Sequence, residues 1–450
     1  MDNRIAKIIK QILPSPFSIA IVLTIVIIMI ALVFTDKNIS EIASFWEKGL
    51  WNPPLMNFAM QMMLMLVLGY VIALSQASEK LIEKITILCH NTSTAAFLVS
   101  VSTIIMSFIN WGLCLVFGAI LARKVGEHAL KNNIDLNYPL IGAAGYSGLM
   151  VWHGGLSGSI PLKVSEINHF SDIVINENLL NKLPVNGISF ESTIFSSMNI
   201  TVTILLLTII PLILYYIGKK NPKGKKFRFE KSTKKNDVSK KIFGAEKIDY
   251  SRWFSKLIGI SILYIAFHQA LSAQSFSFIN PNFVNLSLFG CAICVHRNIK
   301  EFLLAINKSI TSASGILIQF PLYFGIMGIM NSSGLVDIFA NFFVSISTVN
   351  TYPIFTMISG GLVNIFVPSG GGQWAVQGPI LLQSAVDLNL SLPKNIMALA
   401  YGDQLTNMLQ PFWALPLLGI TQLDAKDILP YTIMIMVIGI FIFSSCLIIF

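Results

Sequence analysis

Residues 364–379 constrain the fold more than any other stretch of the chain. They read Asn-Ile-Phe-Val-Pro-Ser-Gly-Gly-Gly-Gln-Trp-Ala-Val-Gln-Gly-Pro and lie inside a long apolar region. Pro368 lacks a backbone donor, and the glycines at 370–372 let the chain leave helical geometry. In hydrocarbon, unpaired backbone groups cost several kcal/mol each, so broken helices occur only where they line a cavity or pack within protein. The stretch therefore predicts the tip of a re-entrant hairpin that helps to form a substrate site in a membrane.

The composition agrees with a membrane location. Of the 450 residues, 54% are apolar and only 12% are charged, which is about half the charged share of an ordinary soluble domain. Many apolar runs reach the roughly 20 residues that cross a bilayer. The net charge of +9 arises in residues 219–252, which hold 13 Lys/Arg and 4 Asp/Glu. This location favours a cytoplasmic loop that follows the positive-inside rule over a nucleic-acid-binding surface.

The apolar runs and the loop charges together predict an all-α polytopic membrane protein. We expect about nine full spans and a cytoplasmic N-terminus. Residues 1–54 are expected to hold a first span and an outer loop, residues 218–252 the basic cytoplasmic loop, and residues 253–309 two linking spans. Residues 55–217 and 310–450 flank this central part. Each is expected to contain a span, a re-entrant hairpin, a broken helix and a further span.

An internal repeat supports this division. The expected hairpins and broken helices are residues 94–121 and 138–160 in the first unit, and residues 352–382 and 395–418 in the second. An asparagine, a tyrosine and a proline recur in the same order: Asn110, Tyr146 and Pro161, then Asn364, Tyr401 and Pro416. The asparagine-to-tyrosine separations are 36 and 37 residues, and both tyrosine-to-proline separations are 15. Loop charge gives the two units opposite orientations, an inverted repeat typical of secondary transporters with a substrate site at mid-membrane.

The same segments carry motifs that resemble the bacterial short-chain fatty acid transporter family. They are VPSGGGQW at 367–374, VQGP at 376–379, YGDQ at 401–404, QPFWALP at 410–416, FINWG at 108–112 and LPSP at 13–16. The resemblance covers nearly the whole chain. In two places the chain departs from the motif: His153 stands where we expect a glycine, and Asp403 stands where we expect a glutamate.

The resemblance implies a carrier of small monocarboxylates, such as butyrate or acetoacetate, in the bacterial inner membrane. The family is part of the wider ion transporter superfamily, whose members of known fold work as dimers by an elevator motion. It thus implies a homodimer surrounded by lipid, without a cofactor, and driven by H⁺ or Na⁺. The sequence leaves the chain length of the substrate, the coupling ion and the direction of transport open.

A short-chain fatty acid presents a carboxylate and a small apolar tail, so its site needs hydrogen-bond donors and an apolar wall. We expect no Lys or Arg in the mid-membrane parts of the hairpins and broken helices. The carboxylate must then be met by backbone amides, helix N-termini and neutral side chains. The expected substrate-binding residues are Asn110, Gly112, His153, Ser157, Asn364, Ser369, Gly370, Gly371, Gly372, Gln373 and Asn407. For the glycines, the alternative is that they only permit close helix packing.

Asp403 is the sole acidic residue of the second broken helix. A carboxylate inside a membrane is costly and is by default a functional hypothesis. We expect Asp403, with Gln404, to couple transport to an ion, either by holding Na⁺ with nearby carbonyls or by carrying a proton. The alternative is a hydrogen-bonded structural acid. His153 is likewise either a core residue or a proton relay or substrate donor.

Four tryptophans could form the wall around the tail or could simply pack and anchor helices. They are Trp111, Trp152, Trp374 and Trp413.

Other functions fit less well. The GLSG run at 155–158 matches a motif of intramembrane serine proteases, but the repeat places Ser157 opposite Phe412, so the serine is not a paired feature. The chain has no His-Glu-x-x-His motif, and no Lys-Ser/Thr follows the glycine triplet. We therefore expect no enzyme. The remaining alternatives are a transporter of another small organic anion and an anion channel.

Overall fold

The computed structural model describes residues 16–224, 244–273, 278–366 and 370–450. The described residues form helices joined by loops and turns, with no strand among them. Most of the basic loop lies outside the described residues, as do Pro368 and Ser369. Six described helices are long and apolar enough to cross a membrane, and three shorter helices are also apolar. The fold is therefore that of a multi-pass all-α membrane protein, as predicted.

The first unit follows an N-terminal pair of helices, α2 (Pro16–Phe34) and α3 (Ile39–Leu50). Its elements are α4 (Pro53–Ala73), α5 (Gln76–Ile87), α6 (Thr92–Ile109), α7 (Trp111–Lys131), α8 (Tyr138–Tyr146), η1 (Ser147–Met150), η2 (Trp152–Gly154), α9 (Ser159–Val164), α10 (His169–Ile173), α11 (Glu177–Leu180) and α12 (Ser197–Lys220). Four central helices follow: α13 (Glu246–Asp249), α14 (Arg252–Ser272), α15 (Pro281–Val295) and α16 (Ile299–Ser309).

The second unit is introduced by the short helix η4 (Ile310–Ala313). Its elements are α17 (Ser314–Ser333), α18 (Leu335–Ile346), α19 (Tyr352–Phe366), α20 (Gly370–Asp387), α21 (Leu392–Thr406), α22 (Pro411–Thr421) and α23 (Ala425–Ile449). In both units a long helix precedes a 12-residue amphipathic helix, two paired helices, a broken helix and a final long helix. The order of elements is thus the same in the two halves.

The first hairpin breaks where the sequence predicts. Asn110 has extended backbone angles and separates α6 from α7, and its side-chain oxygen accepts a hydrogen bond from Leu113 N–H at 2.7 Å. This bond satisfies one of the free amides at the start of α7. The second break comes later than the matching asparagine suggests, because Asn364 lies inside α19 and this helix continues to Phe366. The two asparagines are therefore not structural equivalents.

Both broken helices are confirmed as interrupted elements. The first runs through α8, two 3₁₀ turns and α9, and the second consists of α21 and α22 separated at 407–410. Pro411 begins α22, where a missing N–H is tolerated. Helix α7 also packs against α22, while α20 packs against α9. One helix of each hairpin therefore contacts the broken helix of the other unit, which brings the breaks together.

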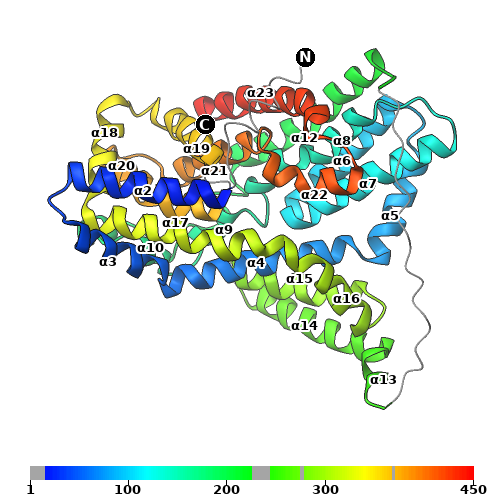
Figure 1. The fold of residues 1–450 in the computed structure, drawn as a ribbon, viewed down its shortest axis with the longest axis horizontal. Coiled ribbons are helices and arrows are strands. Elements are labelled where there is room, and N and C mark those ends of the chain that lie inside the picture. The colour runs from blue at the N-terminus through cyan, green and yellow to red at the C-terminus, as the bar shows by residue number, and fades with distance from the viewer. Residues whose placement is uncertain (1–15, 225–243, 274–277, 367–369) are drawn as a thin grey trace.

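Three helices of 11 or 12 residues were not predicted. They are α3, α5 and α16, all amphipathic. Charged residues interrupt the apolar pattern of these segments, so the sequence predicted loops there. Helices α14 and α15 pack together and extend away from the rest of the protein (Figure 1). Apolar side chains of α14 such as Trp253 and Leu271 are highly exposed, at 87% and 68%, which suits a helix that faces lipid.

Candidate functional site

The two breaks meet through a buried histidine–aspartate pair. His153 Nδ1 lies 2.9 Å from Asp403 Oδ2, and the side chains are 0% and 1% exposed. The backbone N–H of Ile160 donates to His153 Nε2 at 3.2 Å, so Nε2 is the unprotonated acceptor. Nδ1 then carries the proton and donates it to the carboxylate. The imidazole therefore acts as a neutral donor, and it adds no positive charge beside the Asp403 side chain.

Gln404 adds a second link between the breaks. Its side-chain oxygen accepts a hydrogen bond from the backbone N–H of His153 at 3.2 Å. Tyr401, one turn earlier on α21, donates to Asn199 Oδ1 at 3.0 Å, and Asn199 in turn donates to the carbonyl of Gly154 at 2.9 Å. Three side chains thus hold the 3₁₀ segment of the first unit against α21. These contacts fix the orientation of the imidazole with respect to Asp403.

Oxygen atoms gather around Asn364 at the C-terminal end of α21. Asn364 Nδ2 lies 2.7 Å from the Asp403 carbonyl, 2.9 Å from Asn407 Oδ1 and 3.0 Å from Thr406 Oγ1. An amide group has only two hydrogens, so three acceptors exceed what it can satisfy. Within the described residues, Asn364 Oδ1, Asp403 Oδ1 and Gln410 Oε1 are buried without a hydrogen-bond partner. Carbonyl, carboxylate and amide oxygens are the ligands that hard cations prefer, and these residues would supply them near the C-terminal end of α21, where three of the oxygens face Asn364 Nδ2.

A small cavity lies beside this cluster. Its walls are formed by Met62, Trp111, Leu149, Trp152, Ser159, Ile316, Phe320, Gly370, Asn407 and Trp413. Its volume is about 20 Å³, which holds about one water molecule. A four-carbon acid therefore needs the walls to move apart. Ser159 and Asn407 supply the polar side chains of an otherwise apolar wall.

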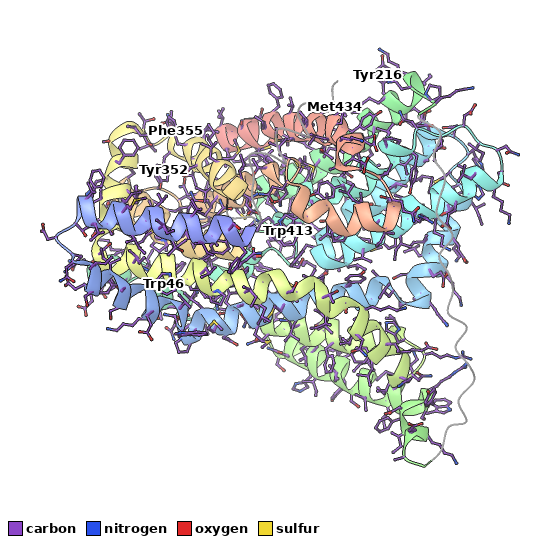
Figure 2. All side chains as sticks on the ribbon, in the orientation of Figure 1. Trp46, Tyr216, Tyr352, Phe355, Trp413 and Met434 are labelled. Atoms are coloured by element: carbon purple, nitrogen blue, oxygen red, sulfur yellow. The ribbon has the colours of Figure 1, made fainter. Side chains whose placement is uncertain are left out.

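Three of the four candidate tryptophans line the cavity. The ring of Trp111 lies 5.8 Å from that of Trp152 and 5.4 Å from that of Trp413, measured between centroids. Trp413 lies near the centre of the view in Figure 2. Trp374 lies elsewhere and donates its indole N–H to His169 Nε2 at 2.8 Å. Burial lowers the pKa of the His169 imidazole, which suits a neutral ring that accepts this bond.

The three glycines at 370–372 have different surroundings: one lines the cavity and two pack against neighbouring helices. Gly370 begins α20 and lines the cavity, and a Cβ there would lie 2.6 Å from His153 Cε1. A Cβ at Gly371 would lie 2.7 Å from the Phe58 ring, and one at Gly372 would lie 2.5 Å from the Tyr323 ring. These two glycines permit close packing, and the cavity wall includes neither of them. The neighbouring candidate Ser369 lies outside the described residues.

The remaining candidates bind other parts of the protein. Ser157 Oγ accepts a hydrogen bond from Trp111 N–H at 2.9 Å, so it ties the first break to the first hairpin. Gly112 packs against α4, where a Cβ would lie 2.8 Å from the Leu66 carbonyl oxygen. Gln373 donates to the Gly360 carbonyl at 2.7 Å, within the second hairpin. Asn110, as described above, caps α7.

Sequence reasoning missed Lys163. The first broken helix was expected to end at residue 160, but α9 continues to Val164 and includes Lys163, whose side chain is only 2% exposed. The expectation that no Lys or Arg lies near the breaks therefore left out a buried cation one helical turn beyond the cavity residue Ser159. The available signal was the four-residue spacing of the two residues, which places them on one helix face.

Comparisons with known proteins agree with the motifs. A family model described as "Short chain fatty acid transporter" matches residues 1–450. An Escherichia coli K12 protein, provisionally named as a short-chain fatty acid transporter, is 33% identical over 432 residues, which are 95% of this chain and 94% of that one. A Haemophilus influenzae protein with the same provisional name is 34% identical over 428 residues, which are 94% and 93% of the two chains.

Two solved structures share the fold. The YdaH transporter of Alcanivorax borkumensis, whose topology is described as unusual, superimposes with a TM-score of 0.54 at 12% identity and covers 96% of this chain and 98% of its own. Neisseria gonorrhoeae MtrF, described as one of a class of antimetabolite efflux pumps, gives a TM-score of 0.57 at 13% identity and covers 98% and 95%. At this level of identity the likeness concerns the fold alone.

Proposed function

Because the chain belongs to the short-chain fatty acid transporter family, we propose that it is a secondary active carrier of small monocarboxylates such as butyrate or acetoacetate. We propose further that it works in the bacterial cytoplasmic membrane and is driven by H⁺ or Na⁺. The observation that carries this proposal is the contact between two helix breaks from different units through His153 and Asp403. Through such a contact, protonation or ion binding in one unit would change the packing of the other unit.

The cavity beside the breaks is the proposed substrate site. Its tryptophans provide a wall for a short alkyl tail, and each buried methylene contributes about 0.8 kcal/mol. The carboxylate would meet the N-terminus of α20 at Gly370, where a long helix presents a partial positive charge. Asn407 and Ser159 are within the same wall and add side-chain donors.

The charge of Asp403 explains why transport would need a coupling ion. A neutral imidazole would not cancel the charge of an ionised Asp403, which would then oppose a second carboxylate in the cavity. Two unit charges about 4 Å apart repel by about 4 kcal/mol at an effective dielectric constant of about 20. A proton on Asp403, or Na⁺ held by the oxygens around Asn364, would remove most of this repulsion. Binding of the ion would then favour binding of the acid.

The size of the cavity favours a moving carrier over an open channel. A volume of about 20 Å³ is too small for butyrate, so each transport cycle would need a rearrangement of the hairpins against the breaks. We propose the elevator motion of a homodimer, with the two units inverted in the membrane, both hairpins re-entrant and the N-terminus in the cytoplasm. The exposed apolar face of α14 would then contact lipid or the partner subunit.

Counterflow in proteoliposomes tests the proposal. Vesicles loaded with unlabelled butyrate should transiently accumulate labelled butyrate, because a carrier alternates between its inward-open and outward-open states with substrate bound. A gradient of H⁺ or Na⁺ should then drive net accumulation, and acids of increasing length should define the tail limit. A channel would give no counterflow, and such a result would reject the carrier.

A further inference from the structure

A second buried charge pair lies at the far end of α9. Lys163 forms an ion pair with Glu166, and their side chains are 2% and 19% exposed. Among the residues that the structure describes, Lys163 is the only lysine or arginine that is buried. Removing such a charge from water costs several kcal/mol. The pair is separate from the His153–Asp403 contact and plays no part in the mechanism proposed above.

One aromatic layer separates Lys163 from the cavity. The ammonium group lies 5.3 Å from the centroid of the Phe58 ring, and the Phe58 and Phe320 rings are 6.3 Å apart. Phe320 lines the cavity, as does Ser159, which lies four residues before Lys163 on α9. A rotation of the flexible lysine side chain past Phe58 would therefore bring its charge towards the proposed substrate site.

Glu166 is held on its other side by the side-chain amide of Gln61 on α4, which also donates to α15. Gln61 Nε2 donates to Glu166 Oε1 at 3.2 Å and to Asn282 Oδ1 at 2.9 Å. Gln61 is 3% exposed, and its own side-chain oxygen has no partner among the described residues. The group that faces Lys163 is thus a carboxylate held in a polar recess at the edge of the protein, since Glu166 is partly exposed.

We propose that Lys163 is a carboxylate-binding residue of the transport pathway and that Glu166 occupies its place until a substrate arrives. This inference rests on the proposed function, because it assigns the cation that a monocarboxylate would otherwise lack. Glu166 and a fatty acid present the same group to the ammonium, so one can replace the other without an uncompensated buried charge. Glu166 can then turn towards solvent. Lys163 would thereby select for anions, independently of the tail.

Uptake kinetics of three variants test this role: Lys163→Met, Glu166→Gln and the double variant. Lys163→Met should raise KM for acetate, propionate and butyrate by the same factor of about 10- to 100-fold, the range of a hydrogen bond to a charged group. Glu166→Gln removes the competing carboxylate and should lower KM for all three acids. Lys182→Met is the control, because Lys182 is an exposed lysine between α11 and α12 and its loss should leave KM unchanged.

The double variant separates binding from structure. If Lys163 only neutralises Glu166, removing both charges should restore wild-type KM, and that result would overturn the proposal. If Lys163 binds substrate, the double variant should regain the folded yield that Lys163→Met loses but keep the raised KM. Should the double variant fail to fold, Glu166→Gln decides, because a raised KM there would also overturn the proposal. A wild-type protein that takes up none of the acids would reject the proposed function itself, and the role of Lys163 with it.

Discussion

Replacing Asp403 by asparagine removes the acidic side chain that joins the two broken helices. The substitution keeps the size of the side chain and an oxygen that can accept the His153 Nδ1–H bond, which is 2.9 Å long in the wild type. The backbone carbonyl of residue 403 still accepts from Asn364, at 2.7 Å in the wild type. We therefore expect the variant to fold and to keep the contact between the units.

The expected effect on ion coupling is large. A cation about 4 Å from a carboxylate gains about 4 kcal/mol at an effective dielectric constant of about 20, so losing the charge weakens Na⁺ binding by up to about a thousandfold. The neutral amide oxygen of the asparagine can still coordinate Na⁺, so the smallest expected loss of Na⁺ affinity is about tenfold. If the coupling ion is a proton, the variant has no acid to titrate, and pH dependence disappears. The variant also resembles the neutralised acid, so the substrate should bind without the ion.

Labelled butyrate uptake and counterflow, measured in the same proteoliposomes, give the readout. The Asp403→Asn variant should retain counterflow but lose accumulation driven by Na⁺ or by a pH gradient. Asp387→Asn is the matched control, because Asp387 is an exposed acid at the end of α20 and its loss should change neither measurement. Unchanged gradient-driven uptake by Asp403→Asn, with unchanged dependence on Na⁺ and pH, would refute the coupling role of this acid.

Two further substitutions test the cavity. Gly370→Ala places a Cβ 2.6 Å from His153 Cε1, whereas a Cβ at Gly419 meets nothing within 4 Å. We expect Gly370→Ala to reduce butyrate uptake at least about tenfold and Gly419→Ala to leave it unchanged. Equal uptake by the two variants would contradict the packing at Gly370. Trp413→Ala enlarges the cavity and should raise uptake of hexanoate relative to butyrate, by about fourfold for each additional methylene that becomes buried. A ratio that stays at the wild-type value would place the tail away from Trp413.

The long helices and their breaks could be predicted from local pattern. The span expected to begin the unit 55–217 corresponds to α4, and the span expected to end the unit 310–450 corresponds to α23. The hairpin break expected at Asn110 is also where the structure has it. These features follow from apolar runs, from residues that favour caps and from proline and glycine, all of which act over a few residues. Local pattern did not predict that α19 continues two residues beyond Asn364, because an asparagine can either cap a helix or form hydrogen bonds from within one.

The contents of the site were harder to predict because they depend on tertiary contacts. Lys163 was assigned to a loop, since charge marks loop boundaries in a membrane protein. Its burial depends on Glu166 and on Gln61, which lies 105 residues from Glu166 in the sequence. Gly371 and Gly372 were expected to face substrate, yet aromatic rings of α4 and α17 approach them. No local pattern distinguishes a glycine that makes room for a ligand from one that makes room for a neighbouring helix.

The two positions at which the chain departs from the expected family motif, His153 and Asp403, contact each other in the fold although they lie 250 residues apart. Aspartate is one methylene shorter than the expected glutamate, and histidine supplies a ring where a glycine was expected. The longer side chain at 153 therefore fills the space that the shorter side chain at 403 leaves. A glycine at 153 would leave Asp403 Oδ2 without its donor and the Ile160 N–H without its acceptor. The imidazole therefore orients the acid and holds the first turn of α9. Because it does so as a neutral donor, it orders the carboxyl group without neutralising it, which leaves that task to the proposed coupling ion.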